Sequence, residues 1–481
     1  MHTPTLTLQR PSDFRSALVI GLAGAILAAS LFYTPIPLVL FVGVPASLYF
    51  VSRPYELLLV MVFLIPFNFV FKIGPLPVAV ELLKIIAWIP FLVHLSTQKK
   101  SFRASRYNWC FAVLAGLLSL SVFRSNDLPF TIKESVRLAS NLGLCYLVLN
   151  LVDSRERIFQ IFRVLTLSTF LVACYGFYQF AIQDYGALFW LVNPRLETTL
   201  SHGRFSFWEW RSRITSVLTS EMELGHYFNV CLPVAVLLWL TEGRKRIGSK
   251  WLLMPIAMLI GLLLTFTFGA WLSLAATTGF FVLAFGQKWR WRALVAGSIV
   301  LLLVGGLVVF GPLRPIVEAK VTGVGVGGLA WDWATRFESW ALAASVVVSH
   351  PLIGIGYGNF PNLTLGALRF LTDEWVSSGS SPHDVYLYIA AELGVLGLLA
   401  MLLVFVPTVW TSLKLRTQPW VGPIGFALAF GLCAAMLGGF SDDSPLYGPH
   451  CGYLVWLFVG LSEATANLAM QQTTTSTTIQ A

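Results

Sequence analysis

Long apolar runs separated by short polar segments dominate this chain of 481 residues. A run of about 20 apolar residues forms a helix long enough to cross the ~30 Å hydrocarbon core of a bilayer. Runs such as LVIGLAGAILAASLF at 18–32 show none of the apolar–polar alternation of membrane β-barrel strands. The pattern therefore predicts an all-α, polytopic integral membrane protein.

The apolar runs place the expected membrane segments along the chain. They lie at about 16–34, 35–51, 55–96, 107–123, 132–152, 164–182, 223–241, 251–286, 293–310, 384–411, 420–440 and 449–466. The runs 55–96, which breaks near Lys72, and 251–286, which turns near Gly269, are each long enough for two helices. The prediction is about 12 transmembrane helices, or about 14 if every short segment spans the membrane.

Basic residues set the expected orientation. Clusters in short loops mark the cytoplasmic side, for example Lys99, Lys100, Arg103 and Arg106, or Arg244, Lys245 and Arg246. Both termini are then cytoplasmic, and the two long polar segments lie outside. The expected parts are a bundle over 1–310 with a Trp/Arg-rich outer segment 183–222, a large outer loop over 311–383, C-terminal helices over 384–466 and a disordered tail over 467–481.

Composition agrees with this organisation. The chain is 56% hydrophobic and 11% charged, about half the charged fraction of a soluble domain. The net charge of +9 is explained by the basic loops, so no nucleic-acid partner is expected. All six cysteines lie in or beside apolar runs, which favours small core residues over disulfides or metal ligands.

The outer loop contains a candidate helix at 327–350. Trp333, Phe337, Trp340 and Ala344 recur at helical spacing and predict one apolar face, which we expect to lie along the membrane surface. Arg336 lies beside this face. Its planar guanidinium can grip a phosphate, or it can pair with a nearby surface carboxylate.

His383 is the candidate general base. Ser381-Pro382-His383-Asp384 resembles a helix start, with Ser381 as the N-cap, which predicts His383 in the first helical turn. The positive end of the helix dipole disfavours an imidazolium ion there, and a neutral imidazole can accept a proton. A polar residue at a membrane interface is the alternative interpretation.

Outer arginines are candidates for binding a diphosphate. Arg204, Arg211 and Arg213 are interleaved with aromatic residues, and Arg137 opens the span 132–152 beside Lys133. Bidentate arginines suit phosphate oxygens. The alternative is an interfacial aromatic belt with arginines that reach to the membrane surface.

Two further motifs have competing interpretations. Asp442-Asp443 can act as a base or hold a divalent metal, although Asp is also ordinary at a turn. The glycines of GIGYGNF at 354–360 resemble a phosphate loop, but no strand precedes them. A tight turn that lets the backbone approach another segment is favoured.

The combination R-x3-W-x9-HPLxGxGxGNF, a polar interval and H-[ND]-x-[YF]-x5-E-x-G-x-x-G resembles the O-antigen ligase and polymerase superfamily. It is carried here by Arg336, Trp340, His350, Pro351, Gly354, Gly356, Gly358, His383, Glu392, Gly394 and Gly397.

The resemblance implies a GT-C-like, inverting, metal-independent glycosyltransferase of the bacterial inner membrane, active on the periplasmic side and without cofactors. It implies an undecaprenyl diphosphate-linked glycan as donor and lipid A–core oligosaccharide as acceptor. His383 and Arg336 correspond to the family's essential histidine and arginine. Arg211, Arg213, Arg137 and Arg204 are the expected diphosphate ligands. Two departures are Asp384, where relatives often have Asn, and Thr267-Phe268-Gly269, where they often have Ser-Arg-Gly.

Three functions therefore remain open from the sequence. An O-antigen ligase is the preferred hypothesis. An O-antigen polymerase or a protein O-oligosaccharyltransferase differs only in the acceptor. A transporter would place charge at mid-bilayer in two repeated halves, and the sequence shows no internal repeat.

Overall fold

The structure, a computed structural model, describes only part of the chain. The described residues are 49–50, 52–67, 71–73, 76–78, 84–98, 101–125, 127–182, 206–208, 211–218, 220–242, 250–286, 331–361, 363, 381–418 and 420–480. The expected spans 16–34 and 293–310, and nearly all of 35–51, lie outside them. The chain divides into two compact units, Met1–Val60 with Ile86–Ser101, and Met61–Ile85 with Phe102–Ala481.

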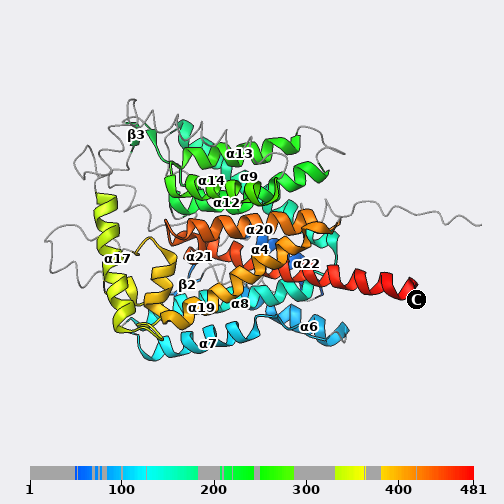
Figure 1. Cartoon of the computed structure of the whole chain (residues 1–481), viewed down its shortest axis with the longest axis horizontal. Coiled ribbons are helices and arrows are strands. Elements are labelled where there is room, and N and C mark those ends of the chain that lie inside the picture. The colour runs from blue at the N-terminus through cyan, green and yellow to red at the C-terminus, as the bar shows by residue number, and fades with distance from the viewer. Residues whose placement is uncertain are drawn as a thin grey trace, which may run out of the picture. The chain divides into compact units, whose positions relative to one another are not determined.

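Helices make up nearly all of the described structure (Figure 1). They are α4 (Pro54–Leu64), α6 (Trp88–Gln98), α7 (Asn108–Phe123), α8 (Leu128–Leu151), α9 (Arg155–Ile182), α12 (Glu221–Leu238), α13 (Lys250–Leu264), α14 (Phe268–Phe285), α17 (Trp331–Ser349), α19 (Val385–Lys414), η3 (Leu415–Thr417), α20 (Gly422–Gly438), α21 (Ser444–Tyr447) and α22 (Cys451–Gln480). Within the described ranges, five helices are long and apolar enough to cross a membrane: α9, α12 extended to Glu242, α14, α19 extended to Thr417, and α22. The prediction of a helical, membrane-embedded protein is confirmed.

The structure also contains two short antiparallel strand pairs, which the all-α prediction did not include. β1 (Phe71–Ile73) pairs with β2 (Leu76–Val78), and β3 (Ser206–Trp208) pairs with β4 (Arg211–Ser212). The first strand pair lies where the sequence predicted a break near Lys72. The turn expected near Gly269 is also present, because α13 ends at Leu264 and α14 begins at Phe268.

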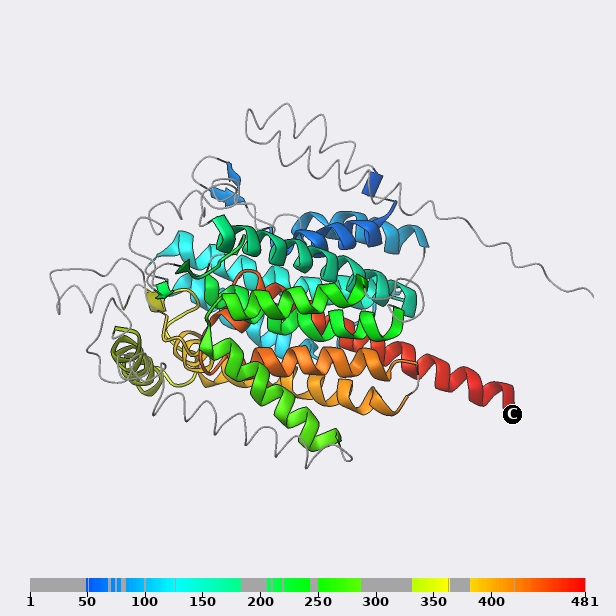
Figure 2. The same ribbon diagram turned by 90° about the horizontal axis from the view of Figure 1, so that it is seen from above.

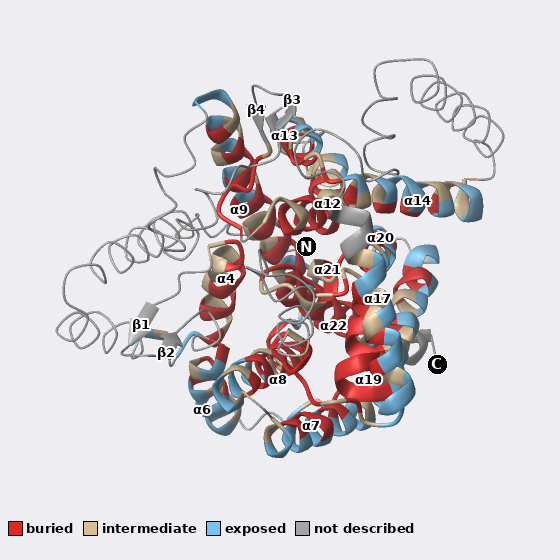
Figure 3. Cartoon of the chain, turned by 90° about the vertical axis from the view of Figure 1, so that its left-hand side faces the viewer, coloured by how far each residue is buried: buried red, intermediate tan, exposed pale blue. Residues whose placement is uncertain are grey.

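The core of the larger unit forms where α12 packs against α20 and α22 packs against α8 (Figures 1 and 2). In an 18-residue apolar stretch of α22, 89% of the residues are buried, whereas 22% are buried in the corresponding stretch of α14. Figure 3 shows the same contrast between α22 and the exposed outer side of α14. α22 is therefore a central helix, and α14 leaves an apolar side open to lipid.

α22 also differs from the sequence prediction in length. It continues to Gln480 and so runs through most of the segment 467–481 that was expected to be disordered. The apolar run ends near Leu468, but a helix that is already nucleated gains one backbone hydrogen bond for each added residue.

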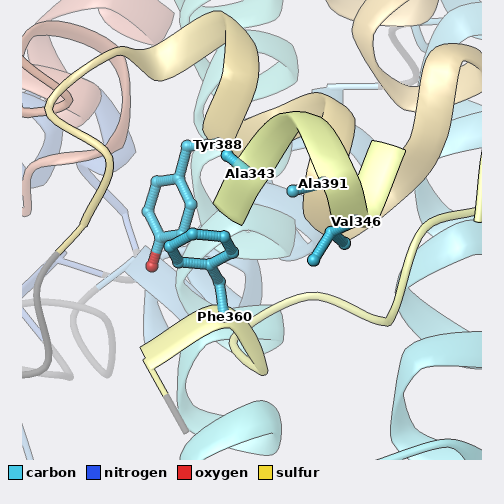
Figure 4. Packing of buried hydrophobic residues seen from close by; sticks show 5 residues of the cluster. All are labelled: Ala343, Val346, Phe360, Tyr388 and Ala391. Carbon is cyan, nitrogen blue, oxygen red and sulfur yellow. The ribbon is translucent and has the colours of Figure 1, made fainter. Parts of the chain in front are cut away.

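α17 packs on α19 through a second face, not through the predicted apolar face, whose expected place along the membrane surface stays a prediction. Phe337 is 58% exposed and Ala344 is exposed, whereas Ala343 and Val346 are buried against Tyr388 and Ala391 of α19 (Figure 4). α17 is apolar on both sides, so helical periodicity could not tell which side faces protein. Arg336 lies one and two turns before the buried positions Ser339 and Ala343, so it belongs to the inner face.

The glycine motif packs against a break in α19. Gly354, Gly356 and Gly358 all have positive φ, and their segment hydrogen-bonds to α19 from Ile355 N–H to the Ala391 carbonyl (3.0 Å) and from Gly356 N–H to the Glu392 carbonyl (2.8 Å). α19 is interrupted at Gly394, where φ is 70°. The predicted role of these glycines, close approach of backbone to another segment, is confirmed.

The close approach of the glycine segment to α19 predicts that adding one methyl group at Gly354 lowers the stability of the folded protein. A Cβ on Gly354 would overlap the backbone of Glu392, and its φ of +61° is strained for any L side chain. Gly354→Ala should destabilise the protein by at least 1–2 kcal/mol, an order-of-magnitude figure for such strain. Thermal unfolding in detergent measures this. The control is Gly279→Ala in α14, where a Cβ meets nothing within 4 Å; equal stability of both variants would refute the packing described.

Candidate functional site

The connection from Ser441 to Tyr447, between α20 and α22, is the point where the candidate residues meet. It contains Asp442, Asp443 and the short helix α21. It lies beside the start of α19, because Val385 N–H donates to the Gly439 carbonyl (2.9 Å). Residues that are far apart in sequence therefore reach one end of the helices.

His383 precedes α19 rather than lying in its first turn, so the predicted helix start is wrong. Asp384 is the N-cap, and its carboxylate accepts hydrogen bonds from Tyr386 N–H (2.9 Å) and Leu387 N–H (3.0 Å). Ser381 instead accepts from His383 N–H (3.3 Å). His383 has a φ of 50°, a left-handed conformation that is unusual outside glycine.

That conformation brings His383 to the two aspartates. One ligand-type atom from each of His383, Asp442 and Asp443 lies within 4.8 Å of the others. Asp442 is 2% exposed and accepts from Ser444 N–H (2.7 Å). The environment of His383 is therefore set by a carboxylate pair as well as by a helix end. The sequence prediction considered the helix end alone.

The two aspartates carry different charges. Burial by itself would raise the pKa of Asp442, but the charges of His226 and His383 and hydrogen bonding to Ser444 together hold it below its ordinary value. Burial and the adjacent Asp442 charge raise the pKa of Asp443 to about 8. Asp442 is then the anion of the pair at neutral pH and Asp443 keeps its proton. An ionised Asp442 can orient the His383 imidazole and stabilise a positive charge on it.

Arg336 reaches the same connection from α17. Its guanidinium donates to the Ser441 carbonyl at 2.7 Å, one residue before Asp442. This contact crosses 105 residues of sequence. The structure therefore brings the two residues predicted as catalytic, His383 and Arg336, to neighbouring positions of one short segment.

Arg213 is held at the turn between α13 and α14. It forms an ion pair with Glu221 (2.8 Å) and donates to the Thr265 carbonyl (2.8 Å) and the Thr267 hydroxyl (3.1 Å). A Cβ on nearby Gly269 would clash with the Ser441 side chain. Arg213 thus lies by the Thr267–Gly269 turn, and this turn adjoins the Ser441–Tyr447 connection.

Arg137 approaches the other end of the connection. It forms an ion pair with Glu134, and its guanidinium carbon lies 5.4 Å from the centre of the Tyr447 ring. Lys133, the other basic residue at this helix opening, lies 3.3 Å from a Glu134 oxygen. Any anion bound by Arg137 would have to share it with Glu134.

The last two predicted arginines are less defined. Arg211 is in β4, but its side chain lies outside the described part of the structure, and Arg204 lies wholly outside the described residues. The geometry therefore assembles four of the six predicted site residues, His383, Arg336, Arg213 and Arg137, around or beside the Ser441–Tyr447 connection.

From the sequence, Asp442 and His383 are alternative candidates for the base. In the structure the two residues lie close together. The sequence prediction also assigned no role to His226, a fully buried residue of α12 that interacts electrostatically with Asp442 and whose ring nitrogens have no hydrogen-bond partner among the described residues. A single sequence carries no signal that joins α12, α19 and the 442–443 pair.

His383, Asp442 and Asp443 are also the described residues that could hold a metal ion. Their donor set suits a divalent cation. However, Asp443 shares a hydrogen bond with Asp442, and Arg336 lies one residue away. Because the two carboxyl groups already bind each other, the same geometry can also work as a hydrogen-bonded acid–base centre.

The glycine motif does not form a phosphate site. Glu392 is fully buried, and its carboxylate accepts Phe360 N–H at 3.1 Å and the Tyr447 hydroxyl at 3.4 Å. It also accepts a hydrogen bond from the Gly358 backbone. The loop amides that could face an anion therefore bind the chain's own carboxylate.

The fold and the site define a membrane-embedded protein with an acid–base centre and arginines at one end of its helices. Residues 253–402 match the family model described as O-antigen ligase. This match confirms the resemblance to the O-antigen ligase superfamily that was noted in the sequence. The match includes Arg336, the glycine motif and His383 but ends before Asp442. A comparison with curated proteins found no similar sequence.

The raised pKa of Asp443 predicts how stability depends on pH. The folded protein keeps a proton that the unfolded chain releases at about pH 4, and the folded value is about 8. Stability attributable to this group should therefore fall as pH rises through that window. Asp443→Asn should flatten the decline in melting temperature between about pH 5 and pH 8.

The matched control is Glu338→Gln, which removes an exposed carboxylate from α17. It should keep the wild-type slope. If Asp443→Asn and the wild type lose stability equally across this range, Asp443 is ionised throughout and the assigned charge state is wrong.

Proposed function

We propose that this protein is an O-antigen ligase. It transfers a polysaccharide from undecaprenyl diphosphate to a hydroxyl of lipid A–core oligosaccharide, on the periplasmic face of the inner membrane. The observation that carries the proposal is the convergence of His383, Asp442 and Arg336 on the Ser441–Tyr447 connection. The match to the family model supports the reaction class.

The reaction needs a group that takes a proton from the acceptor. The hydroxyl oxygen attacks the anomeric carbon, the new C–O bond forms, and the bond from that carbon to the diphosphate oxygen breaks with inversion. His383 receives the hydroxyl proton, and the electron pair of the broken bond leaves with the lipid diphosphate. Such proton transfer contributes about 10²–10⁴-fold to rate.

Asp442 assists His383 by electrostatics. As the imidazole gains a proton it becomes positive, and a buried carboxylate nearby stabilises that charge without having to reorganise. This pairing replaces the helix dipole as the reason for the basicity of His383.

The leaving diphosphate gains negative charge, which the arginines offset. Arg336 donates a hydrogen bond to the Ser441 carbonyl. Arg213 binds the α13–α14 turn, and Gly269 after that turn lies close to the Ser441 side chain. Arg137, Arg211 and Arg204 are the further ligands we assign to the diphosphate. With these cations in place, neither a metal ion nor another cofactor is required for the leaving group.

A purified transfer assay with chelator present tests this mechanism. The wild type should transfer glycan without added metal, and His383→Gln should lose about 10²–10⁴-fold in rate with donor binding retained. Arg416→Gln, a change at the opposite end of α19, is the control and should stay near wild type.

Restoration of activity only by a divalent metal would contradict the mechanism and reassign His383, Asp442 and Asp443 as metal ligands. Offering lipid A–core in one reaction and a second lipid-linked glycan in another separates ligase from polymerase. Transfer to the second acceptor alone would overturn the ligase assignment but keep the reaction centre.

A further inference from the structure

A second polar pocket lies at the opposite end of the helices from His383. α19 begins just after His383 and ends at Lys414, and its 30 residues span roughly 45 Å. A cavity of about 900 Å³ opens beside that far end. Its walls come from the segment just before α7, from the end of α19 with the residues that follow it, and from α22. None of its lining residues belongs to the candidate reaction centre.

One wall of the cavity is basic and polar. It includes Arg106 and Lys414, with Ser105, Thr411, Gln418 and Asn467. Arg106 is oriented by its neighbours, because it donates to the Thr411 hydroxyl (3.2 Å) and its Nε lies 3.7 Å from Glu463. Lys414 lies 5.5 Å from the centre of the Trp410 ring. The two cations are thus positioned before any ligand arrives.

The acidic residue of the pocket offsets only part of this charge. Glu463 is 5% exposed, accepts the Ser105 hydroxyl at 2.8 Å, bonds to the Arg106 backbone and pairs with the Arg106 side chain. Two basic side chains against one carboxylate leave a net positive wall, and α7 adds the positive end of its 16-residue helix there.

The other wall is apolar. Leu415, Ala466, Ala469 and Met470 line it. Leu415, Ala466 and Ala469 belong to a packed cluster that is set by η3 and α22. A ligand that fits both walls has an anionic group joined to hydrocarbon. The pocket lies at the end of the apolar helix α19, which is the level at which we expect lipid headgroups.

We propose that this pocket binds the phosphate of an anionic phospholipid in the leaflet opposite His383, with the first part of an acyl chain along the apolar wall. Arg106 and Lys414 hold the phosphate, and Gln418 and Asn467 face the polar headgroup. The site does not depend on the transferase function. A free phosphate ion would satisfy the basic wall alone, so the two sources are separable.

Native mass spectrometry of the detergent-solubilised full-length protein tests the site. The probes are phosphatidylglycerol and phosphatidylcholine with identical acyl chains, each added to delipidated protein. Wild type should retain phosphatidylglycerol, and Arg106→Gln with Lys414→Gln should weaken it by about tenfold or more, since each surface cation contributes about 1 kcal/mol to anionic-lipid binding. Phosphatidylcholine should bind wild type and variant equally weakly.

Two further variants control for the position of the charge and for loss of stability. Arg103→Gln with Arg416→Gln removes the same charge at the same end but outside the cavity lining, and should bind like wild type. Arg106→Lys with Lys414→Arg preserves the charge and should restore binding if the double glutamine variant is destabilised.

Sodium phosphate identifies the source. Displacement of phosphatidylglycerol by millimolar phosphate alone would show that the pocket takes a free anion rather than a lipid. Equal retention of phosphatidylglycerol in all variants, or equal retention of both lipids by wild type, would overturn the proposal.

Discussion

The site depends on one constraint, which is that a buried polar connection between two membrane helices must find its hydrogen-bond partners inside the protein. The Ser441–Tyr447 connection meets this constraint with groups from α8, α17, α19 and the segment just before α19. Arg336 binds the Ser441 carbonyl, Asp442 is beside His383, and Tyr447 bonds to Glu392 and lies under Arg137. Partners recruited to satisfy the connection are the same groups that can move a proton and offset a diphosphate.

The same constraint explains why the two halves of the family motif occur together. The glycine segment and the start of α19 form a single structural unit, in which Gly356 N–H binds the Glu392 carbonyl and the break at Gly394 leaves room for the backbone of Leu352. Glu392 then joins this unit to the connection through Tyr447. The motif therefore acts mainly by positioning α17 and His383, and only Arg336 and His383 in it face the proposed chemistry.

The sequence predicted the helices well where long apolar runs decide the outcome. It failed at the start of α19, where two local solutions compete. Ser381 and Asp384 are both good N-caps, and the choice of Asp384 fits the tertiary bond from Val385 to Gly439. α17 has apolar residues on two sides, so its buried face follows from packing on α19 and not from periodicity. The sequence leaves Asp442 with two interpretations, a reactive carboxylate or an ordinary turn residue, and its place beside His383, 59 positions earlier, requires the fold.

The central claim is that His383 and Asp442 act as one unit. A double-mutant cycle on the transfer rate tests it most directly, with His383→Gln, Asp442→Asn and the double variant compared under one set of donor and acceptor concentrations. If Asp442 works through His383, the double variant should be no slower than His383→Gln alone. Multiplication of the two single losses in the double variant would contradict the account, because the two residues would then act independently.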